Sequence, residues 1–280
     1  MSGRDILLTG VPRSGTTLCC QLLGRADDCV ALFEPMQVDQ LPTAHDAALA
    51  RIDEFLAGSR GSLLADGSAW SQQVDGNVPD NPFGERTDAS GRRVREAVRG
   101  RIRPGKPLSA GFSLVVKHNA AFTALLPALA QRHPTWAVVR NPLAVLASWH
   151  SVSLPVSSGR LPAGEHLDPV LAGRLASDGD VVGRQLAILD WFFGRYRDAL
   201  PRERVIAYEN VVSSQGRALA DAVDIEAPLL PLRDRNASAL YDAASCTMLV
   251  ERLLADHGAW RRFYREDDVV ALGERMVTSQ

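Results

Sequence analysis

Residues 6–18 read Ile6-Leu7-Leu8-Thr9-Gly10-Val11-Pro12-Arg13-Ser14-Gly15-Thr16-Thr17-Leu18: an apolar strand, a turn bracketed by two glycines, and the start of a helix. Gly10 and Gly15 have the spacing of a phosphate-binding P-loop. Residues without Cβ allow successive backbone N–H groups to converge on one anion at the positive end of a helix. This stretch therefore predicts an anion-binding loop at the carboxyl end of a strand.

The loop departs from that of a nucleotide kinase at one informative position. In a kinase a lysine follows the second glycine, and a Ser or Thr that holds magnesium comes next. Here the pair is Thr16-Thr17, and the cation is Arg13, inside the loop. An anhydride with a single phosphate fits this loop better than ATP does. A phosphotransferase that uses ATP and a nucleotide-binding protein without catalysis remain the alternatives.

Five short apolar segments, each followed by a polar residue or glycine, set the predicted architecture. They lie near 6–10, 29–33, 112–116, 136–139 and 204–207 and finish at Gly10, Glu34, Lys117, Arg140 and Tyr208. Helical periodicity lies between them, at 17–25, 44–57 and 182–200. The pattern predicts one doubly wound α/β domain over residues 1–280 with a mainly parallel sheet, so these five residues should converge on one crevice. Two stretches without periodicity, 58–111 and 151–180, are interpreted as irregular insertions over that crevice, the second of them mobile.

The composition limits the classes of binding partner that we expect. The net charge is −2 and the pI is about 6.3, so no global positive field draws the chain to nucleic acid or to an anionic membrane. We expect a small-molecule partner and local anion sites. No run of 18 apolar residues is present, and the first strand begins too early to leave room for a signal peptide, so a soluble cytoplasmic protein is expected. Cys19, Cys20, Cys29 and Cys246 show no CxxC spacing and are interpreted as reduced packing residues.

Two motifs, in the same order as in a known family, resemble the sulfotransferases that use 3′-phosphoadenosine 5′-phosphosulfate (PAPS). Residues 12–17 resemble the family's 5′-phosphosulfate loop, which implies donor binding by Pro12, Arg13, Ser14, Gly15, Thr16 and Thr17. Residues 140–148 resemble its 3′-phosphate motif, in which an arginine precedes a serine by eight positions. Arg140 and Ser148 would then grip the 3′-phosphate, and no metal would be required.

Two shorter segments extend the resemblance to about half of the chain. Tyr208 opens a Tyr-Glu-Asn segment similar to the family's Tyr-Glu-Asp, which lies near the nucleotide. Trp260 and Arg261 belong to a Gly-x-Trp-Arg segment similar to one near the donor. The resemblance implies in-line transfer of a sulfuryl group from PAPS to a hydroxyl, or a similar nucleophile, of a small-molecule or carbohydrate acceptor. The acceptor's identity and the oligomeric state are not indicated by any motif.

Sulfuryl transfer needs a base for the acceptor and cations for the charge that grows on the leaving oxygen. Lys117 and Arg13 are the expected cations. For the base, Glu34 is favoured over His118, because neighbours in a strand point to opposite faces and Lys117 and His118 are adjacent. Other branches of the family place a glutamate base after the strand that follows the loop helix. Burial is expected to raise the pKa of Glu34 into a useful range.

Six arginines crowd the second half of the first insertion. They are Arg92, Arg93, Arg95, Arg99, Arg101 and Arg103. Two interpretations are open: a solvated helix face, which is favoured, or a grip on an acidic acceptor.

Overall fold

The central sheet has five strands, and all of them run parallel. The computed structural model describes residues 3–177, 179–238 and 240–278. Across the sheet the strands follow the order β2 (Cys29–Phe33), β7 (Ser113–Lys117), β1 (Asp5–Gly10), β8 (Thr135–Val139) and β9 (Val205–Ala207). Each pairs with its neighbour in parallel register. The predicted α/β fold with a parallel sheet is confirmed.

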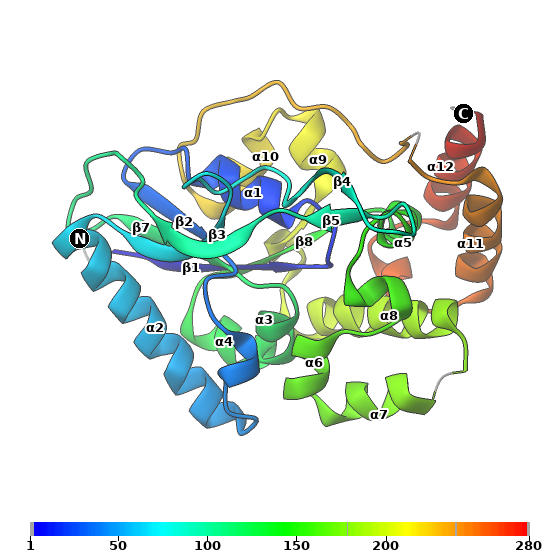
Figure 1. Cartoon of the computed structure of the whole chain (residues 1–280), viewed down its shortest axis with the longest axis horizontal. Helices are drawn as coiled ribbons and strands as arrows, with labels where there is room; N and C mark the ends of the chain where they lie inside the picture. The colour runs from blue at the N-terminus through cyan, green and yellow to red at the C-terminus, as the bar shows by residue number, and fades with distance from the viewer. Residues whose placement is uncertain (1–2, 178, 239, 279–280) are drawn as a thin grey trace.

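Helices cover both faces of this sheet (Figure 1). One face packs against α1 (Thr16–Leu23), α9 (Tyr208–Ser213) and α10 (Arg217–Val223), and the other against α2 (His45–Asp66), α3 (Ala120–Ala124) and α4 (Leu126–Arg132). Side chains of β1 alternate between the two cores, with Ile6 and Leu8 on the first face and Leu7 on the second. A third core joins the end of β8 to α5 (Pro142–His150), α8 (Val181–Ala199), α11 (Ala243–Ala255) and α12 (Glu266–Thr278).

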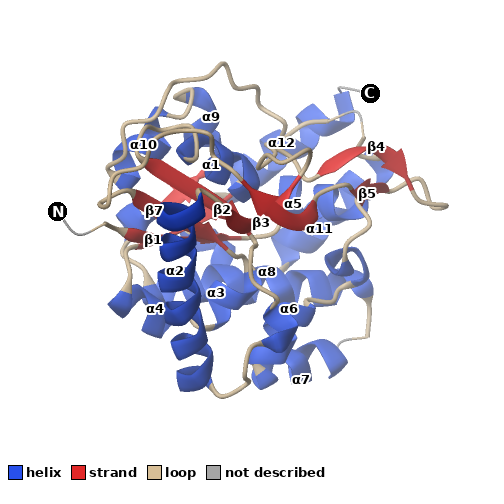
Figure 2. Cartoon of the chain, turned by 60° about the vertical axis from the view of Figure 1, so that its left-hand side comes forward, coloured by secondary structure: helices blue, strands red, loops and turns tan. Residues whose placement is uncertain are grey.

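The first stretch without periodicity is ordered, so its interpretation as an irregular insertion was wrong. Helix α2 continues to Asp66 through Gly58 and Gly61, two residues that weaken the helical pattern. Two antiparallel ribbons follow: β3 (Ala69–Gln73) pairs with β6 (Val98–Ile102), and β4 (Phe83–Thr87) pairs with β5 (Arg93–Arg95). These ribbons lie outside the five-stranded sheet (Figure 2). Their strands were missed because both faces carry polar side chains and the apolar alternation of a half-buried strand is absent.

The second such stretch is helical, which also corrects the expectation. It holds a 3₁₀ helix, η2 (Pro155–Ser158), followed by α6 (Pro162–Leu167) and α7 (Pro169–Ser177). Each of these segments starts at a proline, a residue that is preorganised for the first helical position. Position 178 lies outside the described residues. Three further 3₁₀ helices are η1 (Val38–Gln40), η3 (Arg202–Arg204) and η4 (Ala259–Arg262).

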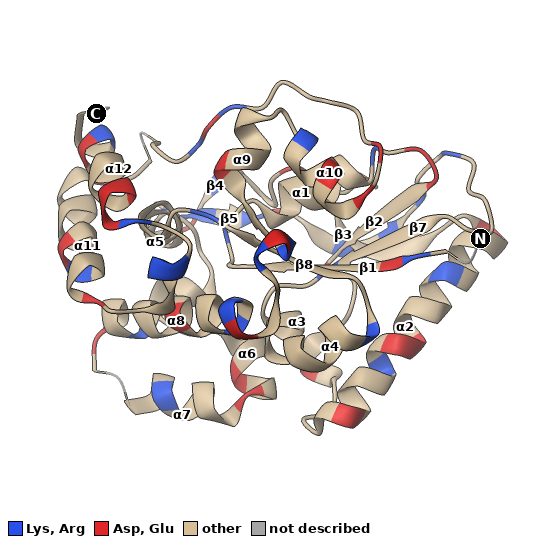
Figure 3. Ribbon diagram, turned by 180° about the vertical axis from the view of Figure 1, so that it is seen from behind, with Lys and Arg blue, Asp and Glu red and all other residues tan. Residues whose placement is uncertain are grey.

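Charges of both signs are spread over the outer helices such as α2 and α12 (Figure 3). Within the described ranges, no helix combines the length and the apolar character that crossing a bilayer requires. Cys19, Cys20, Cys29 and Cys246 are all buried and free, as expected for packing residues.

Candidate functional site

A cavity of about 1290 Å³ lies at the carboxyl ends of the parallel strands. Glu34 follows β2, Lys117 ends β7, Arg140 follows β8 and Tyr208 follows β9, and all four line this cavity. The anion-binding loop adds Pro12, Arg13, Gly15, Thr16 and Thr17 to the lining. Parallel strands thus bring together residues that are far apart in the chain.

The loop has the backbone conformation of an anion cradle. Gly15 has φ 88°, which favours glycine, and it precedes α1 as the N-cap residue without a side-chain cap. A Cβ at Gly15 would lie 2.5 Å from Cδ2 of Tyr208, so the close approach of this ring also requires glycine. Ser14 turns inward and donates to the carbonyl of Val138 at 2.8 Å. The N-terminus of α1 is left facing the cavity, where its N–H groups suit an anion.

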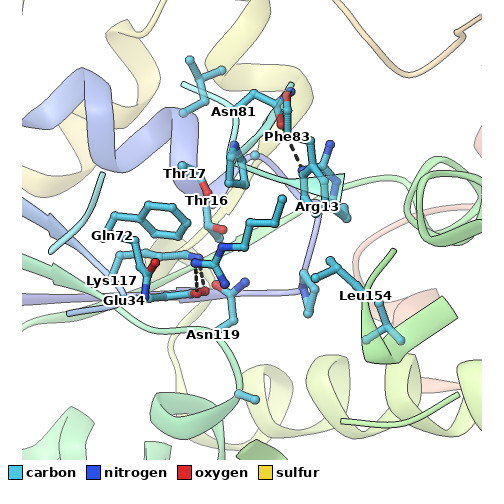
Figure 4. Close-up of a pocket in the computed structure, with 18 of the residues that line it drawn as sticks. Arg13, Thr16, Thr17, Glu34, Gln72, Asn81, Phe83, Lys117, Asn119 and Leu154 are labelled. Atoms are coloured by element: carbon cyan, nitrogen blue, oxygen red, sulfur yellow. Dashed lines mark hydrogen bonds and ion pairs between the residues drawn. The ribbon is translucent and has the colours of Figure 1, made fainter. Parts of the chain in front are cut away.

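Arg13 connects the cradle to the start of the ribbons. Its Nε donates to Oγ of Ser148 at 3.1 Å and its Nη1 donates to Oδ1 of Asn81 at 3.2 Å. The guanidinium carbon lies 4.6 Å from the ring centroid of Phe83 (Figure 4). Ser148 is buried beneath this arginine and is not part of the cavity lining. The structure therefore places Ser148 as an acceptor for Arg13 at the predicted 3′-phosphate end.

Arg140 holds two other segments in place. Its Nε donates to Oδ1 of Asn236 at 2.6 Å, its Nη1 donates to the carbonyl of Arg13 at 3.0 Å, and its Nη2 donates to the carbonyl of Arg235. The guanidinium stacks 4.6 Å from the ring centroid of Tyr208. Arg140 therefore fixes the loop around Arg13 while it presents its charge to the cavity.

Positive charge is concentrated at this end of the cavity. Burial and the charges of Arg140, Arg93 and Arg235 together lower the pKa of Arg13 to about 10, and Tyr241 opposes them. Among the described residues, neither Arg13, Arg93 nor Arg140 has a carboxylate partner. A bound anion would relieve this repulsion. A phosphate suits several guanidinium groups better than a single carboxylate does.

The opposite end holds a chain of three charges. Lys117 Nζ lies 2.6 Å from Oε1 of Glu34, and Arg95 Nη2 lies 3.2 Å from Oε2 of the same carboxylate. Lys117 is 2% exposed and lies 4.6 Å from the ring centroid of Phe33. Figure 4 shows Lys117 and Glu34 pointing toward each other below Thr16 and Thr17. The sequence-predicted cation and base are thus direct partners beside the cradle.

The prediction that the pKa of Glu34 is raised is wrong. Burial does raise the pKa of this carboxyl, but Lys117 and Arg95 outweigh burial and lower the pKa to about 2. Burial in turn lowers the pKa of Lys117, and Glu34 opposes that effect. Glu34 is therefore ionised at neutral pH, and its basicity depends on which cations stay beside it.

His118 lines the same cavity, so the expectation that it turns away from Lys117 was wrong. Strand β7 ends at Lys117, which removes the constraint of alternation one residue earlier than expected. The backbone N–H of Met36 donates to Nε2 of His118 at 3.1 Å, so the imidazole carries its proton on Nδ1. Its ring packs at 5.2 Å against Phe122. The Nε2 lone pair is already used, which disfavours His118 as the base.

His118 should give the protein a measurable acid sensitivity. Burial lowers the pKa of His118 from 6.5 to about 3, with Glu34 opposing the shift. Between these two values the unfolded chain binds more protons than the folded one, so the free energy of unfolding falls as pH drops below 6.5. The slope from this residue is at most about 1.4 kcal/mol per pH unit. In urea unfolding between pH 7 and 5, His118→Asn should lose stability less steeply than wild type.

The matched control for this experiment is His257→Asn, at an exposed position. It should keep the wild-type slope. Equal slopes for wild type and His118→Asn would show that His118 does not remain neutral in the folded state.

Besides Ser14 and Ser148, two more sequence-predicted donor residues are not brought to the cavity. Trp260 is fully buried in the core beside α8, and its Nε1 donates to Asp256. Arg261 donates to the carbonyls of Asp256 and Leu254 and pairs with Glu266. Neither residue lines the cavity. In this chain the segment that resembles a donor-binding motif packs within the C-terminal region.

The arginine cluster contains site residues that the sequence interpretation missed. Arg93 and Arg95 are two apart on β5, Arg99 is on β6, and all three line the cavity. A solvated helix face was therefore the wrong interpretation. The available signal was the Arg-Val-Arg spacing of two, which in a strand directs both arginines to one side.

No protein-family model matches the chain, and no curated protein matches it. Similar solved structures include a sulfotransferase from Alicyclobacillus acidocaldarius (13% identity, 99% of this chain and 97% of that chain, TM-score 0.43). Two others are the sulfotransferase domain of the Synechococcus PCC 7002 olefin synthase (13%, 98% and 95%, TM-score 0.38) and sulfotransferase STF1 from Mycobacterium tuberculosis H37Rv (13%, 91% and 78%, TM-score 0.39). All three are sulfotransferases. Likeness at this level assigns no activity to this chain, so its function has to be argued from the cavity.

Proposed function

We propose that this protein transfers a sulfuryl group from PAPS to a hydroxyl or similar nucleophile of a small-molecule or carbohydrate acceptor. The observation that carries the proposal is the position of the Lys117–Glu34 pair, 2.6 Å apart, directly beside an anion-binding loop that lacks a kinase lysine. The pair supplies a cation and a base at the point where a sulfuryl group on the cradle would be transferred.

The two ends of the cavity suit the two anionic ends of PAPS. The N-terminus of α1, with Thr16 and Thr17, is the proposed site of the 5′-phosphosulfate. Arg13, Arg140 and Arg93 are the proposed partners of the 3′-phosphate, with Ser148 holding Arg13 in position. Arg93 supports this assignment most directly, because its side chain has no hydrogen-bond or ion-pair partner among the described residues and its Nε is buried. The backbone of Arg93 pairs with Ser151 and Ser153, just after the helix that carries Ser148.

The transfer step is proposed as a single in-line displacement. The acceptor oxygen forms a bond to sulfur as the bond between sulfur and the phosphate oxygen breaks. Glu34 takes the acceptor's proton, and Lys117 neutralises the charge that grows on the leaving oxygen. The products are a sulfate ester and adenosine 3′,5′-bisphosphate.

A non-catalytic role is disfavoured by the same geometry. That alternative would be favoured if Glu34 and Lys117 both pointed away from the crevice, whereas both line it. A kinase that uses ATP remains the enzyme alternative, and ligand binding separates it from sulfuryl transfer.

Arg93→Gln tests the donor assignment. Wild type should be stabilised in a thermal-shift titration by adenosine 3′,5′-bisphosphate far more than by adenosine 5′-monophosphate, which lacks the 3′-phosphate. The variant should lose roughly 10- to 100-fold in affinity for the bisphosphate, because a hydrogen bond to a charged group contributes about 1.5–3 kcal/mol. Its affinity for the monophosphate should not change.

Arg86→Gln is the control on the same ribbon, since the Arg86 side chain is 72% exposed and does not line the cavity. It should bind both nucleotides as wild type does. Stabilisation by ATP with magnesium, and none by the bisphosphate, would reject sulfuryl transfer in favour of the kinase alternative. Equal losses for both nucleotides in Arg93→Gln would place Arg93 away from the 3′-phosphate.

A further inference from the structure

Three buried side-chain atoms lack any hydrogen-bond partner among the described residues, and all three belong to the cavity lining. They are Nε of Arg93, Nε of Arg95 and Oδ1 of Asn119. Leaving a buried polar atom unpaired is destabilising, and native proteins contain few such atoms. Their gathering around one cavity indicates that a ligand satisfies them. Arg93 lies at the proposed 3′-phosphate end, which leaves Arg95 and Asn119 for the other substrate.

Arg95 is placed beside the reacting groups. Its Nη2 contacts Oε2 of Glu34 at 3.2 Å, and its guanidinium carbon lies 5.4 Å from the ring centroid of Phe33. Asn119 comes two residues after Lys117 and, like Arg95, lines the cavity. Both unpartnered atoms therefore flank the Lys117–Glu34 pair, where an acceptor must bring its nucleophile.

Only one of the two donors on one edge of the Arg95 guanidinium has a hydrogen-bond partner among the described residues. Nε and Nη2 form one edge of the guanidinium, and their two N–H groups point in parallel, as a carboxylate or phosphate requires for a bidentate pair. Glu34 occupies the Nη2 arm through a single contact of 3.2 Å, and the Nε arm is empty. A second anion that spanned both arms would form a stronger pair than the one Glu34 makes.

The surrounding charges favour such an anion. Arg99 also lines this side; its Nε donates to the carbonyl of Pro35 at 2.9 Å and its guanidinium stacks 4.2 Å from the ring centroid of Trp70. Its contacts among the described residues include no carboxylate. Lys117 is assigned to the leaving oxygen. The cavity lining then includes Arg95 and Arg99 beside the acids Glu34 and Asp39, and Asp39 is exposed. Glu34 loses its negative charge when it takes a proton. Arg95 and Arg99 would then have one negative charge fewer beside them, unless the acceptor supplies one.

Resting on the proposed function, we infer that the acceptor is an anionic hydroxyl compound whose acidic group, a carboxylate, sulfate or phosphate, binds the Nε–Nη2 edge of Arg95. A hydroxyl or amide N–H of the same compound donates to Oδ1 of Asn119. The acceptor's acidic group displaces Arg95 from Glu34 as it binds. The reacting hydroxyl then loses its proton to Glu34 as its oxygen bonds to sulfur and adenosine 3′,5′-bisphosphate leaves.

This arrangement couples acceptor binding to the base. Arg95 is one of the two cations that hold the pKa of Glu34 low against the effect of burial, so its removal makes the carboxylate a better base. A neutral acceptor leaves Arg95 on Glu34. Neutral compounds should therefore show a lower kcat as well as a higher KM.

The test begins with an extract of the cells in which the protein occurs. The extract is divided on an anion-exchange resin at neutral pH, and the retained and unretained fractions are each incubated with wild type and sulfur-35-labelled PAPS. We expect labelled product from the retained fraction. Arg95→Gln should lower that labelling at least about 10-fold, the loss expected for a charge-assisted hydrogen bond, and Arg95→Lys should restore only part of it because lysine lacks the fork. Arg86→Gln, exposed on the same ribbon, should label as wild type does.

A matched pair then isolates the acidic group. The acceptor is identified from its labelled product. This acceptor and its neutral derivative, prepared by esterifying the acceptor's carboxylate or by hydrolysing its own sulfate or phosphate, are then compared as substrates of wild type and of each variant. Wild type should prefer the acidic form at least about 10-fold in kcat/KM, and Arg95→Gln should remove that preference through a loss of kcat/KM for the acidic form. Unchanged stabilisation of Arg95→Gln by adenosine 3′,5′-bisphosphate verifies its fold.

Each result has a distinct meaning. Label from the unretained fraction alone overturns the anionic acceptor and leaves sulfuryl transfer intact. Wild-type labelling of the retained fraction by Arg95→Gln overturns the role of Arg95. Label from neither fraction overturns the proposed sulfuryl transfer itself, and the acceptor inference with it.

Discussion

Replacing Lys117 by methionine should lower kcat for sulfuryl transfer by about 10²–10³-fold, because removing one preorganised donor from a developing oxyanion costs about 2.7–4 kcal/mol. Lys117 is buried and held between Glu34 and Phe33, so its ammonium is already in place before the donor arrives. Methionine keeps the unbranched stem and removes the charge. Single-turnover measurement with bound PAPS reports the chemical step without product release.

The chain offers a matched control for this substitution. Lys106 is its only other lysine, and it donates to the carbonyl of Gly24 at 2.7 Å, away from the cavity. Lys106→Met should keep the wild-type rate of the chemical step. Glu34 retains Arg95 in Lys117→Met, so the carboxylate is not left without a cation. A Lys117→Met enzyme with wild-type kcat would remove Lys117 from the transfer step.

The second large effect is expected for Glu34→Gln. Glutamine keeps the size of the side chain and can still accept from one of the two cations through its single carbonyl oxygen, but it cannot take a proton. Loss of a general base should lower kcat by about 10²-fold or more. Affinity for adenosine 3′,5′-bisphosphate, measured by titration, should stay nearly unchanged because Glu34 lies at the transfer end of the cavity.

His118→Asn separates the two candidate bases. Asparagine is too short to replace Nε2 as the acceptor for the N–H of Met36, but it leaves Glu34 in place as the proposed base, so this variant should lose much less activity than Glu34→Gln. If His118→Asn abolished turnover while Glu34→Gln stayed active, the assignment of the base would be reversed. The Met36 contact would then have to open during the reaction to free the Nε2 lone pair.

The opposing influences on Glu34 also predict how stability depends on pH. The folded-state pKa of this carboxyl is about 2, below its ordinary 4.5, so the folded protein binds fewer protons than the unfolded chain between these values. The stabilisation is complete above pH 4.5 and is lost as pH falls through the folded pKa. Glu34→Gln should therefore remove part of the acid sensitivity below pH 4.5, whereas the His118 contribution begins at pH 6.5, so the interval between pH 4.5 and 6.5 reports on His118 without Glu34.

Local sequence patterns were sufficient for the sheet and for much of the site. Apolar runs that finish at Glu34, Lys117, Arg140 and Tyr208 predict buried parallel strands, and parallel strands necessarily end at one edge. The glycine spacing of residues 10 and 15 likewise predicts a left-handed turn before a helix. Such features depend on near neighbours in the chain, which is why they can be recognised without the tertiary structure.

The ribbons and the helices of the second insertion could not be recognised in this way. Strand β5 pairs with β4 and, through Arg93, with Val152, and its arginines line the cavity, so no apolar periodicity marks it. Arg95 is held by Glu34, 61 positions away in the chain. The same applies to Trp260 and Arg261, whose local motif resembles a donor segment while their packing directs them into the C-terminal core.

The sequence by itself therefore determined the parallel α/β sheet, the glycine-bracketed turn before α1 and the strand-end residues, because each follows from spacing within a few residues. Only the tertiary structure decided the protonation and partners of these residues. The pKa of Glu34 is set by the balance between burial and two cations, Lys117 from β7 and Arg95 from β5. The position of His118 is set by the end of β7 at Lys117. Electrostatic energies depend on distances in space between residues remote in the chain, and sequence spacing does not specify those distances.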